Sequence, residues 1–147
     1  MKTIKLSILL SILSVTIMAQ NTNLPIDEET GLITYKEVVE EKGEREVTGA
    51  LFERKIPRIV SIDGFGVEVE PEGNILLCYG LDKPGLIGKI GKILGDKGIN
   101  IARMTFSRKR KGGEAITVLN VDSQVSERIR EEIEKLEDID KAEVIVL

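Results

Sequence analysis

Four residues between positions 82 and 100 have the chemical types that bind a small polar ligand. The carboxylate of Asp82 can accept hydrogen bonds from an ammonium or hydroxyl group. Gly85 and Leu86 lie where a helix is expected to begin, and free backbone N–H groups at a helix start attract a carboxylate. Asn100 offers both donors and an acceptor. Two of these residues also have a purely structural explanation, since Asp82 can cap a helix and Asn100 can complete a turn.

A strand, a helix and a second strand must position these residues. The short apolar run 75–79 is typical of a buried strand. Asp82 and Pro84 indicate a helix start, and Gly98, which can adopt a positive φ, indicates its end. A second strand is expected to begin over 99–104. Five apolar residues fall on one face of the helix: Leu86, Ile87, Ile90, Ile93 and Leu94.

Three glycines interrupt this helix, and each costs about 1 kcal/mol of helix stability relative to alanine. Gly88, Gly91 and Gly95 recur at spacings of three and four, which clears one side of the helix. We therefore expect this side to lie very close to the sheet or to a partner.

The rest of the C-terminal half continues this alternation. The second strand is expected to run on to Lys111, a turn follows at Gly112-Gly113, and further strands are expected at 115–121 and 142–147. A second helix is predicted to start at Ser126. The order β-α-β-β-α-β predicts an α+β, ferredoxin-like domain over residues 73–147, with two helices on one face of a four-stranded antiparallel sheet.

The N-terminal half is less regular. Residues 1–19 resemble a signal peptide, because two lysines precede an apolar run and Ala19-Gln20 could be cleaved; the run is too short for a stable membrane span. An apolar strand or an uncleaved anchor is an alternative. Residues 20–45 are expected to form a polar linker or short strands, such as 32–39. The string LPIDEETGLITYKEVVE resembles the beginning of small exported bacterial proteins of unknown function.

Residues 46–72 are expected to form a β-hairpin segment. Asp63-Gly64 is a strong hairpin-turn signal, because both positions can adopt a positive φ. Pro57 is expected to interrupt the strand pattern. The turn 71–73 is the expected domain boundary.

Composition argues against several functional classes. The net charge of −4 and an aromatic content of 3% argue against a nucleic-acid partner, and the basic run Arg108-Lys109-Arg110-Lys111 is interpreted as a solvated hairpin end. The lack of histidine and the single Cys78, interpreted as a buried apolar residue, exclude the usual zinc sites. No nucleophile–base pair and no phosphate-binding loop are found, so we expect no cofactor and no enzymatic activity.

The strings LDKPGLIGKIGKILGDKGINIA and GGEAITVLNVD resemble an ACT domain, the amino-acid-binding regulatory module, and in particular the C-terminal module of phosphoglycerate dehydrogenases. The string VTGALFERKIPRIVSIDGFGVEVEPEGNILL is similar to the segment that leads into that module. The resemblance covers roughly residues 46–147 and leaves out residues 1–45, as well as the family's nucleotide-binding and substrate domains.

The resemblance implies a homodimeric module that binds a small amino acid, with serine expected, in the control of serine biosynthesis. Relatives line an effector site between two subunits with residues that match Asp82 and Asn100, while Gly80 replaces a larger polar residue that many relatives have. Two alternatives stay open: a dimerisation or interaction module without a ligand, and an exported protein of unknown role. The signal-like segment predicts export to the periplasm, whereas a role in serine biosynthesis predicts the cytoplasm.

Overall fold

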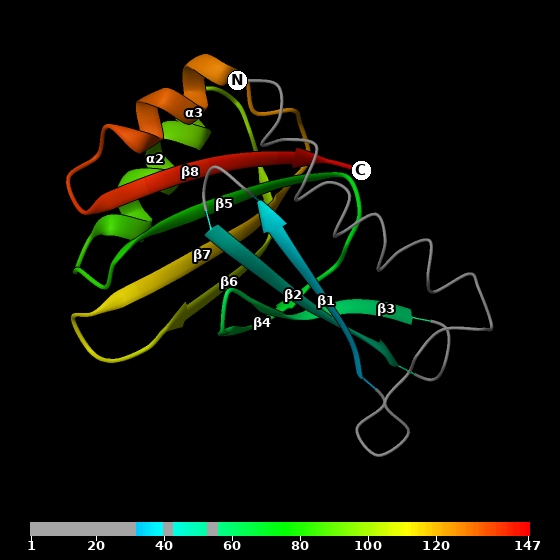
Figure 1. The fold of residues 1–147 in the computed structure, drawn as a ribbon. Coiled ribbons are helices and arrows are strands. Elements are labelled where there is room, and N and C mark those ends of the chain that lie inside the picture. Colours follow the sequence, from blue (N-terminus) through cyan, green and yellow to red (C-terminus); the bar gives the residue numbers. More distant parts are fainter. Residues whose placement is uncertain (1–31, 40–42, 53–55) are drawn as a thin grey trace. The chain divides into compact units, whose positions relative to one another are not determined.

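The computed structural model describes residues 32–39, 43–52 and 56–147 of the chain (Figure 1). The signal-like segment 1–19 and residues 20–31 of the expected linker lie outside the described residues. The chain divides into two compact units between Pro71 and Glu72. In the described ranges, no helix combines the length and apolarity needed to cross a membrane.

The first unit contains an antiparallel four-stranded sheet in the order β1-β2-β3-β4. Its strands are β1 (Leu32–Val39), β2 (Gly43–Phe52), β3 (Ile56–Ile62) and β4 (Phe65–Val69). The expected boundary between residues 45 and 46 therefore falls inside β2. Pro57 lies within β3, so the predicted interruption is wrong. Strand β4 pairs with β3 only from Ile59 onward, so β4 needs no N–H donor at position 57.

The predicted hairpin turn at Asp63-Gly64 is confirmed. The two residues have φ values of 51° and 78°, and they join Ile62 of β3 directly to Phe65 of β4. The Asp63 carboxylate accepts a hydrogen bond from the Glu46 N–H at 3.1 Å, and the Asp63 N–H donates to the Glu46 carbonyl at 2.8 Å. The turn is thereby tied to β2.

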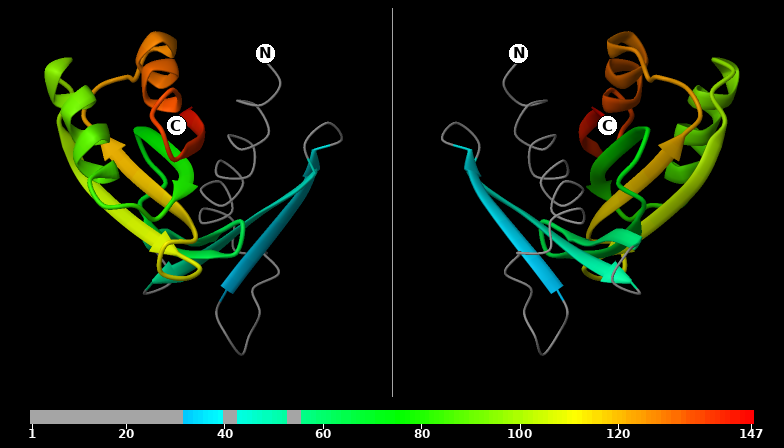
Figure 2. Two further views of the ribbon diagram at one scale, coloured as in Figure 1. Left: turned by 90° about the vertical axis from the view of Figure 1, so that its left-hand side faces the viewer. Right: turned by 90° about the vertical axis from the view of Figure 1, so that its right-hand side faces the viewer.

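The second unit confirms the predicted β-α-β-β-α-β order. It contains β5 (Asn74–Leu81), α2 (Leu86–Asp96), β6 (Ile101–Arg108), β7 (Glu114–Val121), α3 (Glu127–Glu134) and β8 (Ile139–Val146). Its antiparallel sheet has the order β6-β7-β5-β8, so β5 is central and β6 and β8 are the edges. Both helices lie on the same face of this sheet (Figure 2).

An apolar core fills the space between the helices and the sheet. Burial raises the pKa of the Cys78 thiol to about 12, which keeps it protonated and unreactive. Burying each large aliphatic side chain contributes about 1.5–3 kcal/mol, so this core is the main stabilising element of the unit. Its buried members are Leu76, Cys78, Leu86, Ile90, Leu94, Ile99, Leu119, Val121, Val125, Ile133, Ala142 and Val144.

Helix α2 is shorter at its start than the sequence predicts. It begins at Leu86 after Gly85, whose φ is 86°, and its first turn has no side-chain cap, so the expected cap by Asp82 is wrong. The predicted end is confirmed, because Gly98 has a φ of 70° and the Ile99 N–H donates to the Leu94 carbonyl at 2.9 Å.

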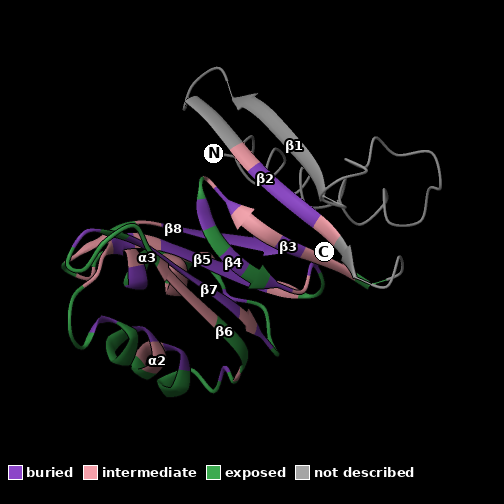
Figure 3. Ribbon diagram, turned by 90° about the horizontal axis from the view of Figure 1, so that it is seen from below, coloured by how far each residue is buried: buried purple, intermediate pink, exposed green. Residues whose placement is uncertain are grey.

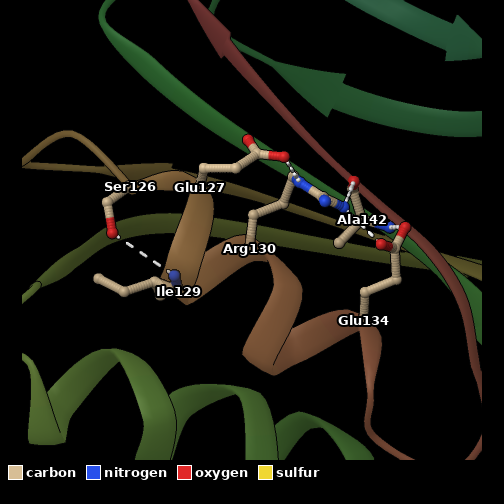
Figure 4. A network of polar contacts seen from close by, with 6 residues as sticks. All are labelled: Ser126, Glu127, Ile129, Arg130, Glu134 and Ala142. Carbon is tan, nitrogen blue, oxygen red and sulfur yellow. Dashed lines mark hydrogen bonds and ion pairs between the residues drawn. The ribbon is translucent and has the colours of Figure 1, made fainter. Parts of the chain in front are cut away.

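Helix α3 is fastened to β8 by a network of charged groups (Figure 4). Ser126 caps the helix by accepting from the Ile129 N–H, as predicted. The Arg130 guanidinium donates to the carboxylates of Glu127 and Glu134 and to the Ala142 carbonyl, and Glu134 accepts from the Ala142 N–H at 3.1 Å. Glu134 is therefore only partly exposed, and its carboxylate contacts the backbone of β8.

The glycines of α2 do not provide close packing within the described chain. A Cβ atom built at Gly88, Gly91 or Gly95 meets no atom within 4 Å, and Figure 3 shows much of the outer surface of α2 exposed. The close approach occurs at Gly80 instead. A Cβ atom there would lie 2.0 Å from the backbone carbonyl oxygen of Asp138, where β8 shifts its register against β5.

We predict opposite effects on stability for two Gly-to-Ala substitutions. Gly80→Ala should lower the free energy of unfolding by about 1–3 kcal/mol, because the new methyl group collides with backbone atoms. Gly88→Ala should raise it by about 0.5–1 kcal/mol, because the helix gains alanine's propensity at no steric cost. Urea unfolding of both variants measures the difference, and equal stabilities would contradict the packing at Gly80.

A second prediction concerns acid stability. Burial opposes ionisation of Glu134, but the hydrogen bonds from Arg130 and Ala142 outweigh it and lower its pKa from 4.5. Its stabilising contribution, about 1 kcal/mol at this partly exposed site, is therefore present above pH 4.5 and lost as the pH falls through the lowered pKa. Glu134→Gln should be less stable than wild type at pH 7, and this difference should shrink on acidification.

The matched control is Glu131→Gln, on an exposed residue of the same helix. It should follow the wild-type stability curve from pH 7 to pH 3. A Glu134→Gln deficit that stays constant across this range would show that ionisation of Glu134 does not contribute to stability.

Candidate functional site

Asp82 lies directly after β5 and is bound to the β6–β7 hairpin. Its Oδ2 accepts from the Arg108 guanidinium at 2.5 Å and from the Gly112 N–H at 3.0 Å, and its own N–H donates to the Gly113 carbonyl at 2.8 Å. The Gly112 hydrogen bond and Arg108 together lower the pKa of Asp82, so the side chain is a carboxylate at neutral pH. Within the described residues, Oδ1 makes no hydrogen bond.

The hairpin is shaped to make this contact. Leu81 pairs with Glu114 across β5 and β7, so the next residue of the chain, Asp82, meets the turn 109–113. Gly112 has a φ of 70°, and a Cβ atom at Gly113 would lie 2.6 Å from Cγ of Arg110. The two predicted turn glycines thus allow the turn to place one N–H and one C=O against Asp82.

The start of α2 offers unbonded N–H groups, but Leu86, one of the two residues that the sequence indicates, does not supply one. Leu86 donates its N–H to the Lys83 carbonyl at 3.3 Å, and its side chain lies in the core, so it is not available to a ligand. The N–H groups of Ile87 and Gly88 make no hydrogen bond within the described residues, and the first turn contains no acidic side chain. Such N–H groups attract an anion.

Asn100 lies at the other end of α2. Its side-chain Nδ2 donates to the Asp122 carboxylate at 2.8 Å, and its backbone carbonyl accepts from the Asp122 N–H at 3.1 Å. Helix α2 has 11 residues. It is therefore about 16 Å long. The fold gathers Asp82 and Gly85 at one end of the helix and separates them from Asn100.

Gly80 has a structural role in this arrangement. The residue is buried, and the Asp138 carbonyl occupies the space of a side chain. A larger side chain at position 80, as the resemblance implies for many relatives, needs a different path of the turn around Asp138. Gly80 can therefore shape the site but offers a ligand no side chain.

Sequence reasoning missed the groups that hold the predicted site residues. Arg108 and Gly112 fix Asp82, and Asp122 fixes Asn100. Sequence reasoning also missed Ile87 and Gly88, which supply unbonded N–H groups at the start of α2. The register of the hairpin beside β5 was the available signal for Arg108 and Gly112. In the described part of the chain, no group of three or more His, Cys, Asp or Glu residues could hold a metal ion.

Comparison with known proteins agrees with this architecture. The sequence profile of the ACT domain matches residues 74–138. The D-3-phosphoglycerate dehydrogenase of Methanocaldococcus jannaschii is 33% identical over 144 residues, which covers 94% of this chain and 27% of that protein. The Bacillus subtilis protein of the same name is 42% identical over 90 residues, covering 61% of this chain and 17% of that protein.

These matches also correct the extent of the resemblance. A coverage of 94% exceeds what residues 46–147 can supply, so the similarity continues into residues before 46, where none was expected. The chain spans about a quarter or less of the length of these curated relatives. Residues 74–138 are an ACT domain, and its homologues are parts of D-3-phosphoglycerate dehydrogenases.

Proposed function

We propose that the ACT domain is a regulatory module that binds a small amino acid, with serine as the expected effector. One observation carries the proposal: the unbonded N–H groups of Ile87 and Gly88 lie a few residues from the Asp82 carboxylate, whose Oδ1 is also unbonded within the described residues. The N–H groups suit the carboxylate of an amino acid, and Oδ1 suits its ammonium group.

We further propose that a second copy of the chain completes the site. Asn100 is separated from Asp82 by the length of α2, about 16 Å, which is far longer than a free amino acid. A two-fold pairing can bring the start of one α2 beside the end of its partner. Asp82 of one subunit and Asn100 of the other would then bind the same ligand.

The side of β6 is the proposed contact between the copies. Strand β6 is an edge of its sheet, and Met104 on it is 45% exposed. Open edges favour pairing with another strand. Ile87 on α2 is also 39% exposed. Pairing two β6 strands would join two sheets of the second unit into one.

The relatives support a proposal for the cellular role. Proteins named D-3-phosphoglycerate dehydrogenase contain this domain, so we propose that the module acts in the control of serine biosynthesis and therefore in the cytoplasm. Export through the signal-like segment 1–19 is the competing proposal for location. N-terminal sequencing of the protein from fractionated cells distinguishes the two.

A second candidate function is an interaction module without a ligand. The observation that favours it is the commitment of Asp82, whose Oδ2 is already bound by Arg108 and Gly112. Under this alternative, the carboxylate only fastens the hairpin to β5, and the domain still self-associates.

We predict that Asp82→Ala and Asn100→Ala each weaken serine binding about ten- to a hundredfold in titration calorimetry. This is the loss expected for a charge-assisted hydrogen bond of about 1.5–3 kcal/mol. Asp96→Ala is the matched control, because it removes the same charge from an exposed ion pair with Lys92 on α2. It should bind serine as wild type does.

Mixing the two binding variants tests the shared site. Each heterodimer would combine one intact Asp82 with the partner's intact Asn100, so part of the wild-type affinity should return. A mixture that never recovers any binding would contradict the cross-subunit site, and wild-type protein that binds no amino acid would favour the interaction module.

Self-association gives a separate prediction. Met104→Lys places a charge on the exposed edge strand β6 and should weaken the dimer at least about tenfold in sedimentation analysis. The control is Val146→Lys, at a residue with the same 45% exposure on the other edge strand, β8. If Val146→Lys dissociates the dimer and Met104→Lys does not, the proposed contact through β6 is wrong and β8 forms the contact instead.

A further inference from the structure

The site carries more positive charge than the rest of the chain would suggest. We define the basic rim as Lys83 together with residues 108–111 of the β6–β7 hairpin. With the acids Asp82 and Glu114 beside them, these five cations leave a net charge of +3, in a chain whose net charge is −4.

Only part of this charge is neutralised. Arg108 pairs with Asp82 at 2.5 Å, and Lys109 pairs with Glu114 at 2.6 Å. Lys83, Arg110 and Lys111 are exposed, and they form no ion pair with the described residues. Three cations of the rim are therefore available to a ligand.

Hydrogen bonds hold the rim against the proposed site. Gly112 donates to the Asp82 carboxylate and Gly113 accepts from the Asp82 N–H, which places the adjoining Lys111 near Asp82. Lys111 is close enough to help lower the pKa of Asp82, after the larger effects of Gly112 and Arg108. Lys83 directly follows Asp82 in the chain.

Acidic groups on the opposite side of β5 do not cancel this charge at Asp82. The turn there contains Glu137 and Asp138 and contacts Leu81, whose N–H donates to the Asp138 carbonyl at 2.9 Å. The Gly112 hydrogen bond lowers the pKa of Asp82, and so do Arg108 and Lys111, which are both cations. Positively charged side chains therefore lie close to this carboxylate.

We propose that the basic rim selects an amino acid that carries a second negative charge, as a carboxylate or phosphate on its side chain. The inference rests on the proposed function. The α-carboxylate would bind the start of α2, the ammonium group would bind Asp82, and the additional anion would lie among Lys83, Arg110 and Lys111. A neutral amino acid such as serine binds the same way without the last contact.

Titration calorimetry at low salt with pairs of ligands tests the inference. Aspartate should bind about three- to tenfold more tightly than asparagine, and O-phosphoserine more tightly than serine, as expected for a few exposed charge contacts. The preference should fall as salt is added, because exposed charges are screened. Inorganic phosphate alone should bind more weakly than O-phosphoserine.

Variants identify the residues responsible. The double variant Lys83→Gln/Lys111→Gln should remove most of the preference for the anionic ligands and change asparagine or serine binding less than about twofold. Lys89→Gln is the matched control, because Lys89 is exposed on α2 and has no ion pair within the described residues. It should keep the preference.

The outcomes separate this inference from the proposed function. Equal binding of each ligand pair, a preference that survives in the double variant, or phosphate binding as tight as that of O-phosphoserine would overturn the selectivity while leaving amino-acid binding intact. Absence of binding by every amino acid would instead overturn the proposed function, and the selectivity with it.

Discussion

Backbone hydrogen bonds fix the end of β5 on both sides, and the candidate site depends on these two bonds. Leu81 donates to the Asp138 carbonyl on one side, and Asp82 donates to the Gly113 carbonyl on the other. The first contact requires a residue without a side chain at position 80. Gly80, Asp138 and the hairpin glycines therefore act together, although they lie far apart in the sequence, and they determine where the Asp82 carboxylate is placed.

The order of elements could be predicted because short-range sequence patterns determine it. Apolar periodicity distinguishes α2 from β5, Ser126 and Gly98 mark helix ends, and Asp63-Gly64 supplies the positive φ values of its turn. The failures come from interactions that local patterns do not contain. Pro57 is tolerated because β4 pairs with β3 only further along, and the glycines of α2 face open space in the described chain.

The candidate site was predictable in its residue types and not in its connections. Asp82 reads locally as a helix cap, but the strand register brings it to a hairpin 30 residues away, which competes successfully for its carboxylate. Asn100 likewise finds Asp122, 22 residues away. Both pairings arise from the sheet order β6-β7-β5-β8, so they could follow only from the assembled topology.

The glycine content of α2 determines how binding at its first turn would affect the order of the whole helix. A helix of 11 residues with three glycines has little intrinsic tendency to form, so its order depends on the apolar face that it buries. Helix formation is cooperative, and a ligand fixed at the first turn would restrict the backbone along the whole segment. Under the proposed function, we expect ligand binding at the first turn to lower the conformational entropy of the whole helix without displacing either end.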